Sequence, residues 1–200
     1  MNRPTRKRRS PEESRANILA AAERLLISNG PQSLRLADVA KEASVVHATI
    51  LHHFGSIHGV HTALMERMIE DLVERILALQ MPEGAEIPRG FAFNLLIEAF
   101  NDKGAARLAA WLELTDESRR LTSVREAVNT VIREKIRPEG VPLDRLEDII
   151  LLSITMALGI GLFGPSLEAM LDRPDGRTRE MALELFHSGL ETLSNPNGKS

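Results

Sequence analysis

The sequence of 200 residues predicts an all-helical (all-α) protein: an N-terminal three-helix head built on a helix-turn-helix, a long linking helix and a C-terminal helical bundle. Apolar residues recur three and four positions apart over most of the chain, which is the period of a helix buried on one side. No segment shows the alternation of apolar and polar residues that a half-buried strand requires. The apolar content of 43% and the charged content of 26% fit a helical protein with a substantial core.

The first helix is expected directly after a basic arm, Met1 to Arg9. The run Ser10-Pro11-Glu12-Glu13 is typical of a helix start, in which Ser caps the helix, Pro takes the first position and the second Glu reaches back to the cap. Asn29-Gly30-Pro31 predicts the end of this helix. Its expected core positions are Ile18, Leu19, Ala22, Leu25 and Leu26.

A helix-turn-helix is predicted in residues 33–54, where two short apolar-periodic segments meet at a turn of small residues. The apolar positions of the first segment are Leu36, Val39, Ala40 and Ala43. Those of the second are Val45, Ala48 or Thr49, Ile50 and Phe54. Because such a motif places its second helix in the major groove of DNA, the first hypothesis is a DNA-reading protein.

A long helix is predicted to follow the break at Gly55-Ser56 and to extend to about residue 80. Its apolar stripe consists of Ile57, Val60, Leu64, Met68, Leu72, Ile76 and Leu79. We therefore expect two domains, with the arm and helix-turn-helix in residues 1–55 and the linking helix and bundle in residues 56–200. Further helical patterns lie near residues 89–102, 104–115, 119–137, 143–164 and 176–194.

Positive charge is concentrated in the first third of the chain. Residues 1–65 carry nine Lys or Arg and five Asp or Glu, a net charge of +4, whereas the whole chain carries −3. A surface that binds a polyanion is therefore expected in the first third. The arm supplies five of these cations. A charged terminus is often only solvated, but its place just before a DNA-binding helix favours contact with the minor groove or phosphates.

The run from Ile149 to Leu167 contains nineteen consecutive uncharged residues, close to the roughly 20 that span a bilayer. Its flanks are acidic, and its three glycines and Pro165 are expected to interrupt a helix. A helix buried on all sides, between two subunits, is therefore favoured over a membrane span. The chain contains no Cys and shows no signal peptide, so we expect a cytoplasmic protein without membrane contact.

Five of the six histidines lie between residues 47 and 61, which raises the question of a metal site. Adjacent His52 and His53 point about 100° apart on a helix, and no carboxylate lies between Glu42 and Glu66. Polar groups at a phosphate surface are therefore the preferred interpretation, and no metal is expected. The sequence has no glycine-rich phosphate loop and no nucleophile-elbow motif, so we expect neither an enzyme nor a cofactor.

The stretch SRANILAAAERLLISNGPQSLRLADVAKEASVVHATILHHFGSIHGVHTALMERM resembles the N-terminal DNA-binding region of the tetracycline repressor (TetR) family. The capped first helix, the Asn-Gly turn, Asp-Val-Ala, Thr-x-x-His-His-Phe and the next helix follow one another in the family's order. This match covers about a quarter of the chain. It implies a homodimeric, ligand-responsive transcriptional regulator, in which each long helix links a DNA-reading head to a ligand-binding body.

The resemblance also implies which residues contact double-stranded DNA. The second helix of the motif would enter the major groove, with the arm beside it. The residues implied to face the bases are His47, Ala48 and Leu51, and those at phosphates are Arg35, Thr49 and His53. His52 is a further implied DNA-binding residue, and the arm contributes Arg6, Lys7, Arg8 and Arg9.

The sequence departs from the family pattern at several of these positions. Ser44 replaces the turn glycine, and Arg35 and Val46 replace the Ser or Thr caps of the two helices. Leu51 stands where a groove-facing Tyr is common, and Ile57 where a Lys is common. Each replacement removes a hydrogen bond or a phosphate charge, which changes the expected target preference.

The second region would sense a small-molecule effector. Large apolar side chains with a few polar groups among them could line a pocket for a mainly apolar ligand, although the same residues at helical spacing also serve as plain core. The candidate ligand-binding residues are Met68, Phe91, Asn94, Phe100, Arg107, Trp111 and Met156.

The same region would form the homodimer. The last helix has a wide apolar face, and together with the helix from Ile149 to Phe163 it predicts half of a symmetric four-helix interface. The candidate interface residues are Ile154, Leu158, Phe163, Met181, Leu185, Phe186, Gly189 and Leu193.

The sequence thus favours a repressor that binds a palindromic operator as a homodimer and is released by a small, mainly apolar ligand. The alternative is a helical ligand-binding or scaffolding dimer whose DNA head has degenerated, which Val46, Leu51 and Ile57 suggest. DNA binding by the purified chain separates the two hypotheses.

Overall fold

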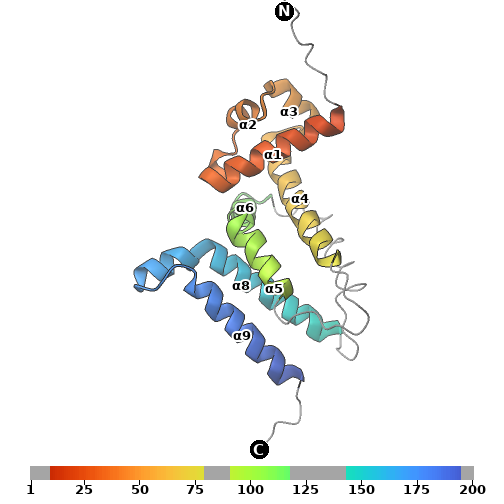
Figure 1. The fold of residues 1–200 in the computed structure, drawn as a ribbon. Coiled ribbons are helices and arrows are strands. Elements are labelled where there is room, and N and C mark those ends of the chain that lie inside the picture. The colour runs from red at the N-terminus through yellow and green to blue at the C-terminus, as the bar shows by residue number, and fades with distance from the viewer. Residues whose placement is uncertain (1–9, 79–90, 118–142, 195–200) are drawn as a thin grey trace, which may run out of the picture. The chain divides into compact units, whose positions relative to one another are not determined.

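The computed structural model describes residues 10–78, 91–117 and 143–194, and within these ranges it contains helices and no strand (Figure 1). The all-helical prediction is confirmed. The helix predicted near residues 119–137 lies outside the described ranges. The elements are α1 (Pro11–Asn29), η1 (Pro31–Ser33), α2 (Leu36–Ala43), α3 (His47–Phe54), α4 (Ile57–Leu77), α5 (Phe91–Ile97), η2 (Glu98–Asp102), α6 (Ala105–Leu114), α8 (Leu143–Met170) and α9 (Arg177–Ser194).

The chain divides into two compact units between Leu64 and Met65. Helix α4 runs through this division, so its first turns belong to the first unit and the rest belongs to the second. The domain boundary expected after residue 55 falls just past the end of α3 and stays a prediction.

Helix α1 begins at the predicted capping box. Ser10 Oγ accepts a hydrogen bond of 3.1 Å from the Glu13 N–H, and the Glu13 carboxylate accepts one of 2.8 Å from the Ser10 N–H. The pair satisfies two backbone donors that a helix start leaves without intrahelical partners. At the other end Gly30 closes the helix with φ +83°, a backbone conformation that glycine adopts at little cost.

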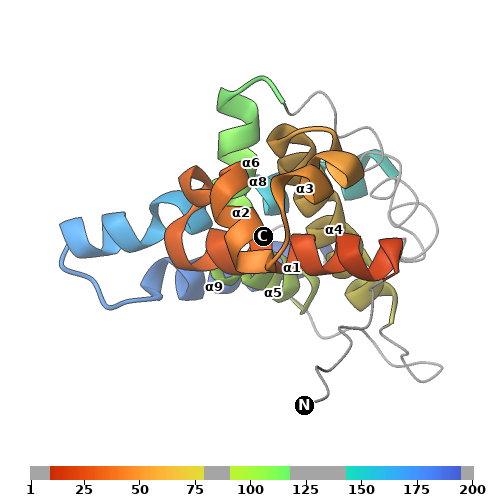
Figure 2. The ribbon, with the colours of Figure 1, turned by 90° about the horizontal axis from the view of Figure 1, so that it is seen from above.

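The first unit has a small apolar core between its helices. Helix α1 lies beside α2 and α3, as Figures 1 and 2 show. Five of its fully buried side chains occupy positions that the apolar period of the sequence predicts for the core. These side chains are Ile18, Leu26, Val39, Ile50 and Val60.

The turn between α2 and α3 is built on Ser44, which has the left-handed conformation with φ 54° and ψ 46°. The N–H groups of Ser44 and Val45 donate to the carbonyls of Lys41 and Ala40 over 3.1 and 2.9 Å. An L-residue in this region costs roughly 1–2 kcal/mol. The departure from glycine noted in the sequence therefore leaves local strain in the motif.

Helix α8 is the central helix of the second unit, where it contacts α5, η2, α6 and α9 (Figure 1). Its buried residues pack into the main apolar cluster of this unit. The cluster consists of Phe93, Ile97, Ala157, Ile160 and Ala182, with Leu96, Phe100, Met156 and Leu183 against it. A neighbouring cluster joins Leu72 of α4 to Leu95 and Ala99.

The segment η2 is a π-helix, in which the Lys103 N–H donates to the Glu98 carbonyl five residues earlier over 3.2 Å. The sequence pattern predicts a helix near residues 89–102, and the structure shows that its last part has the π form. In the observed arrangement, a Cβ atom on Gly161 of α8 would lie 2.8 Å from the Phe100 carbonyl oxygen. The absence of a side chain at Gly161 therefore lets α8 approach η2.

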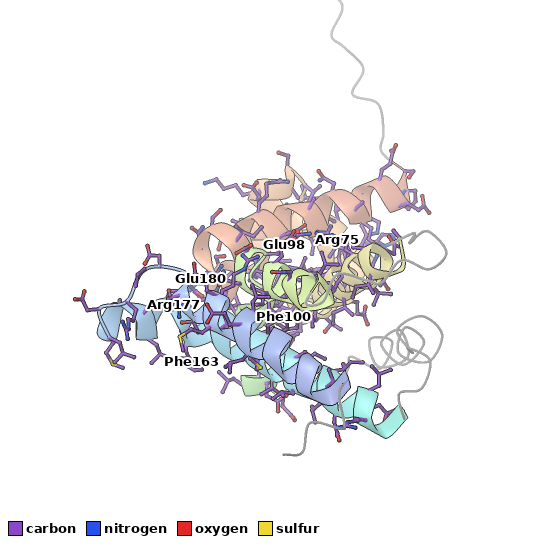
Figure 3. The ribbon with its side chains drawn as sticks, turned by 60° about the horizontal axis from the view of Figure 1, so that its bottom comes forward. Arg75, Glu98, Phe100, Phe163, Arg177 and Glu180 are labelled. Carbon is purple, nitrogen blue, oxygen red and sulfur yellow. The ribbon has the colours of Figure 1, made fainter. Side chains whose placement is uncertain are left out.

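Arg75 of α4 and Glu98 of η2 form a bidentate ion pair with N–O distances of 3.0 and 2.8 Å (Figure 3). The hydrogen bonds from Arg75 hold the pKa of Glu98 below its ordinary value. Because the two side chains are 39% and 37% exposed, solvent screens the pair, and we expect a contribution of at most about 1 kcal/mol.

Helix α8 continues to Met170, so the expected interruption by the glycines and Pro165 is wrong. Proline removes one backbone hydrogen bond, to the carbonyl of Gly161, and crowds that carbonyl. Burial of Ile160, Gly164 and Glu168, four residues apart, keeps both sides of the proline packed. Tertiary packing thus outweighs the local penalty.

Glu168 joins the end of α8 to the start of α9. Its two carboxylate oxygens accept hydrogen bonds from the N–H groups of Gly176 over 2.9 Å and Thr178 over 2.7 Å. Together with the Thr178 side chain, these donors lower the pKa of Glu168 from its ordinary 4.5. The positive end of the helix dipole at the start of α9 also stabilises the negative charge of this carboxylate.

One side of α8 is apolar and open to solvent within the single chain, so the helix is not buried on all sides by its own chain. Its exposed apolar residues are Leu151, Leu152, Phe163, Leu167 and Met170. Among the described helices, α8 is the one long and apolar enough to cross a bilayer. Core helices of soluble proteins pass the same test, and α8 packs against four neighbouring elements, although only 22% of its apolar window is buried within the chain.

Candidate nucleic-acid interface

Helix α3 has one buried side and one exposed side. Ile50 is fully buried, whereas His47, Ala48, Leu51 and His52 are exposed. These four positions are spaced i, i+1, i+4 and i+5, so they share one face of the helix. Thr49 and His53 are half-buried, and Arg35 is exposed at the start of α2. The arm residues Arg6, Lys7, Arg8 and Arg9 lie outside the described ranges.

The start of α3 is suited to a negatively charged partner. Neither Arg35 at the start of α2 nor Val46 at the start of α3 makes a side-chain cap. This agrees with the sequence, because a cationic and an apolar side chain both lack an acceptor for the helix N–H groups. The first turn of α3 contains no acidic residue. A helix start carries partial positive charge, which attracts a phosphate. No carboxylate in this turn opposes that attraction.

Two residues of α1 hold the C-terminal ends of the two helices of the motif, and the sequence patterns did not identify them. The guanidinium carbon of Arg15 lies 4.5 Å from the centre of the Phe54 ring, and its Nη1 donates to the His53 carbonyl over 3.4 Å. Asn17 Nδ2 donates to the Ala43 carbonyl over 2.8 Å. These bonds satisfy carbonyls that the C-terminal ends of α3 and α2 leave without helical partners.

The candidate ligand residues lie at several depths in the second unit. Met68 is buried in α4, and Phe100 and Met156 pack against the main cluster. Asn94, Arg107 and Trp111 are half-buried, while the Phe91 side chain lies outside the described part. The contacts of Phe100 and Met156 are those of core residues.

The candidate dimer residues divide by exposure. Ile154 and Leu158 are half-buried in α8, whereas Phe163 is 59% exposed and Met181 and Leu185 of α9 are exposed as well (Figure 3). Phe186, Gly189 and Leu193 belong to α9, but their exposure lies outside the described part. The sequence reasoning missed a further group of exposed apolar residues, Leu151, Leu152, Leu167, Met170 and Leu171. Because α8 is apolar on nearly every side, the sequence pattern carried no signal for which of these residues stay exposed, and Leu171 lies just past the end of the helix.

Comparison with known proteins supports the interpretation of the head. Residues 18–63 match the family model of bacterial regulatory proteins, tetR family. The HTH-type transcriptional regulator TtgR of Pseudomonas putida is 30% identical over 97 residues, which are 48% of this chain and 46% of TtgR. The chain thus spans about half the length of the curated relatives it matches.

Solved structures resemble most of the chain. The match to the multidrug binding protein EbrR, complexed with imidazole, covers 88% of this chain and 94% of EbrR with a TM-score of 0.58 and 21% identity. The match to the fatty acid degradation regulator FadR from Bacillus halodurans covers 92% and 98% with a TM-score of 0.57 and 16% identity. At these identities the likeness shows the fold. Residues 18–63 thus resemble the head of the bacterial tetR family regulators, and most of the chain shares the fold of these solved structures.

Proposed function

We propose that this chain is a ligand-responsive transcriptional repressor that binds a palindromic DNA operator as a homodimer in the cytoplasm. The observation that carries the proposal is the exposed face of α3, where His47, Ala48, Leu51 and His52 lie opposite the buried Ile50. A short helix held in this way can enter the major groove with these side chains against base edges. Leu51 would contact a thymine methyl group, while the imidazole of His47 would form hydrogen bonds.

The homodimer is supported by the open apolar side of α8. Leu151, Phe163 and Leu167 follow one another along this side at multiples of four residues, with Gly159 among them. Apart from the adjacent residues and the helix's own backbone, no atom of the described residues lies within 4 Å of a Cβ placed on Gly159, so a second helix can approach closely there. A symmetric pair of such faces would remove this apolar surface from water.

The effector proposed here is a small, mainly apolar molecule that binds in the second unit. It is supported by the half-buried polar groups Asn94 and Arg107, which are sequence neighbours of the buried Phe93 and Leu108, whereas Phe100 and Met156 pack as core. An effector can only release DNA if it binds more tightly to the conformation that binds DNA poorly. A coupling of about 1–3 kcal/mol would lower operator affinity roughly 5- to 150-fold.

The DNA proposal is tested by selecting duplexes from random-sequence DNA with the purified full-length protein. We expect a palindromic consensus with half-sites about 34–36 Å apart or slightly more, and an affinity that falls steeply with salt. His47→Ala and Leu51→Ala should change the preferred bases at particular positions. Failure to select any duplex would favour the alternative, a dimer with a degenerate head.

The dimer proposal is tested by sedimentation of Phe163→Glu. A charge placed in the centre of an apolar interface costs several kcal/mol, so this variant should sediment as a monomer. The control is Leu114→Glu, which changes an apolar residue of α6 that is 86% exposed and lies off the α8 face. A Phe163→Glu protein that stays dimeric would place the subunit contact elsewhere.

A further inference from the structure

The first turns of α4 pack closely against the end of α3, the helix that we propose enters the major groove. Gly59 stands beside Phe54, the last residue of α3, and a Cβ atom on Gly59 would overlap the Phe54 carbonyl oxygen. Val60, the next residue, is fully buried. The Gly59 N–H donates to Ser56 Oγ over 3.1 Å, which caps the start of α4. The end of α3 and the beginning of α4 thus form one tightly packed joint.

The same turns of α4 also reach the beginning of the motif. His61 is 3% exposed, and its Nε2 lies 3.0 Å from the carbonyl oxygen of Leu34. Since a carbonyl oxygen only accepts, this bond requires a hydrogen on Nε2. Leu34 is buried and lies between η1 and α2, one residue before the Arg35 position that lacks a side-chain cap. A buried hydrogen bond therefore ties α4 to the segment that leads into α2.

We propose that His61 is a positioning residue for DNA recognition, which sets where α2, and with it α3, sits against α4. This inference rests on the DNA-binding function proposed above. Besides the core contact of Val60, helix α4 meets the motif through Gly59 at the end of α3 and through His61 before α2. Two contacts separated by the whole motif fix its rotation about α4, which a single contact would leave adjustable.

The role of His61 follows from what its loss would do. A buried carbonyl that loses its donor is costly, so the segment at Leu34 would shift to find water or another donor. Any such shift moves α2, and α3 moves with it because Asn17 and Ser44 fix the short turn between them. Misplaced base-reading side chains lose specific contacts, whereas phosphate attraction changes little.

The experiment compares full-length His61→Leu and His61→Gln with the wild type. Each protein is titrated with a duplex that the wild type selects from random-sequence DNA and with an unrelated duplex of equal length, and folding is checked by circular dichroism. We expect His61→Leu to bind the selected duplex on the order of tenfold more weakly, with its affinity for the unrelated duplex and its salt slope unchanged. His61→Gln, whose amide nitrogen can take the place of Nε2, should restore the selected affinity.

The control is Glu70→Leu, which changes an exposed residue farther along the same helix and should behave as the wild type. His58 does not serve as a control, because the centre of its ring lies 5.8 Å from that of His61. The inference is overturned if His61→Leu binds the selected duplex normally, if it loses both duplexes equally, or if His61→Gln is as weak as His61→Leu. If His61→Leu does not fold, His61→Asn takes its place, because the Asn side chain is one carbon shorter than that of Gln and its amide nitrogen does not reach the Leu34 carbonyl oxygen. Equal binding by the Asn and Gln variants then overturns the inference. A wild type that selects no duplex refutes the proposed function itself, which is a separate outcome.

Discussion

Asn17 in α1 donates a hydrogen bond of 2.8 Å from its side-chain nitrogen to the carbonyl of Ala43, the last residue of α2. This contact joins the first helix to the turn of the helix-turn-helix, 26 positions away in sequence. It supplies a donor to a helix end that would otherwise need water.

We expect Asn17→Ala to lower the free energy of unfolding by about 1 kcal/mol, since one partly buried hydrogen bond is lost. Asn17→Asp should cost more, because a carboxylate oxygen would then face the carbonyl oxygen. Urea unfolding followed by circular dichroism measures both. Asn29→Ala serves as the control, because Asn29 is exposed at the end of α1. Equal stability of the Ala variant and the wild type would show that water replaces this bond without cost.

Ser44→Gly should raise the free energy of unfolding by up to about 1 kcal/mol, because glycine adopts the left-handed conformation without the steric penalty that Ser bears. The control is Ser28→Gly, in the last turn of α1, where glycine should lower stability by roughly 0.5–1 kcal/mol. Thermal or urea unfolding of both proteins tests the pair. A Ser44→Gly protein less stable than the wild type would contradict the assignment of strain to this turn.

Arg35→Ala should weaken binding to all duplexes alike and flatten the dependence of log K on log salt by up to about 0.9, the change expected for one lost phosphate contact. Arg145→Ala removes an exposed cation from α8 and should leave the slope unchanged. Fluorescence anisotropy at several salt concentrations gives both slopes. If the two variants behave alike, Arg35 does not contact phosphate.

The pKa of Glu168 is lowered in the folded protein, so its ionised form contributes stability at pH values above the unfolded-state pKa. This contribution is lost as the pH falls through the lower folded pKa, where the carboxylate takes up a proton. We therefore expect Glu168→Gln to destabilise the protein at neutral pH and to differ less from the wild type in acid. Urea unfolding from pH 7 down to pH 3 measures the difference. A difference that stays constant over this range would mean that the charge of Glu168 is unimportant.

Local signals in the sequence predicted the head well. The capping box at Ser10 and Glu13, the Gly30 end of α1 and the buried positions of α2 and α3 all depend on residues within about one helical turn of one another. The interactions that form these features can therefore be predicted from short stretches of the sequence. The contacts that hold the motif in place, from Arg15, Asn17 and His61, join residues 26 to 38 positions apart and leave no periodic mark.

The second unit was harder to predict because tertiary packing overrides local preference there. Pro165 favours a helix end, yet α8 continues past it with Gly164 and Glu168 buried. An apolar period also cannot show which side of an almost wholly apolar helix stays open, so Leu151 and Leu167 were missed. Phe100 and Met156 could be named as large apolar residues, but their place in the main cluster follows only from the fold.

The π-helix at Glu98–Asp102 has a consequence for how this chain should be compared with its homologues. A π turn holds one more residue than an α turn, so removing one residue there would restore regular α-helix while the flanking segments keep their faces. Insertions and deletions in related chains are normally placed in loops. For a related chain that is one residue shorter in this region, we expect the gap to belong inside the helix, between residues 98 and 102, because a gap in the nearest loop would assign Phe93 and Ile97 to the wrong face.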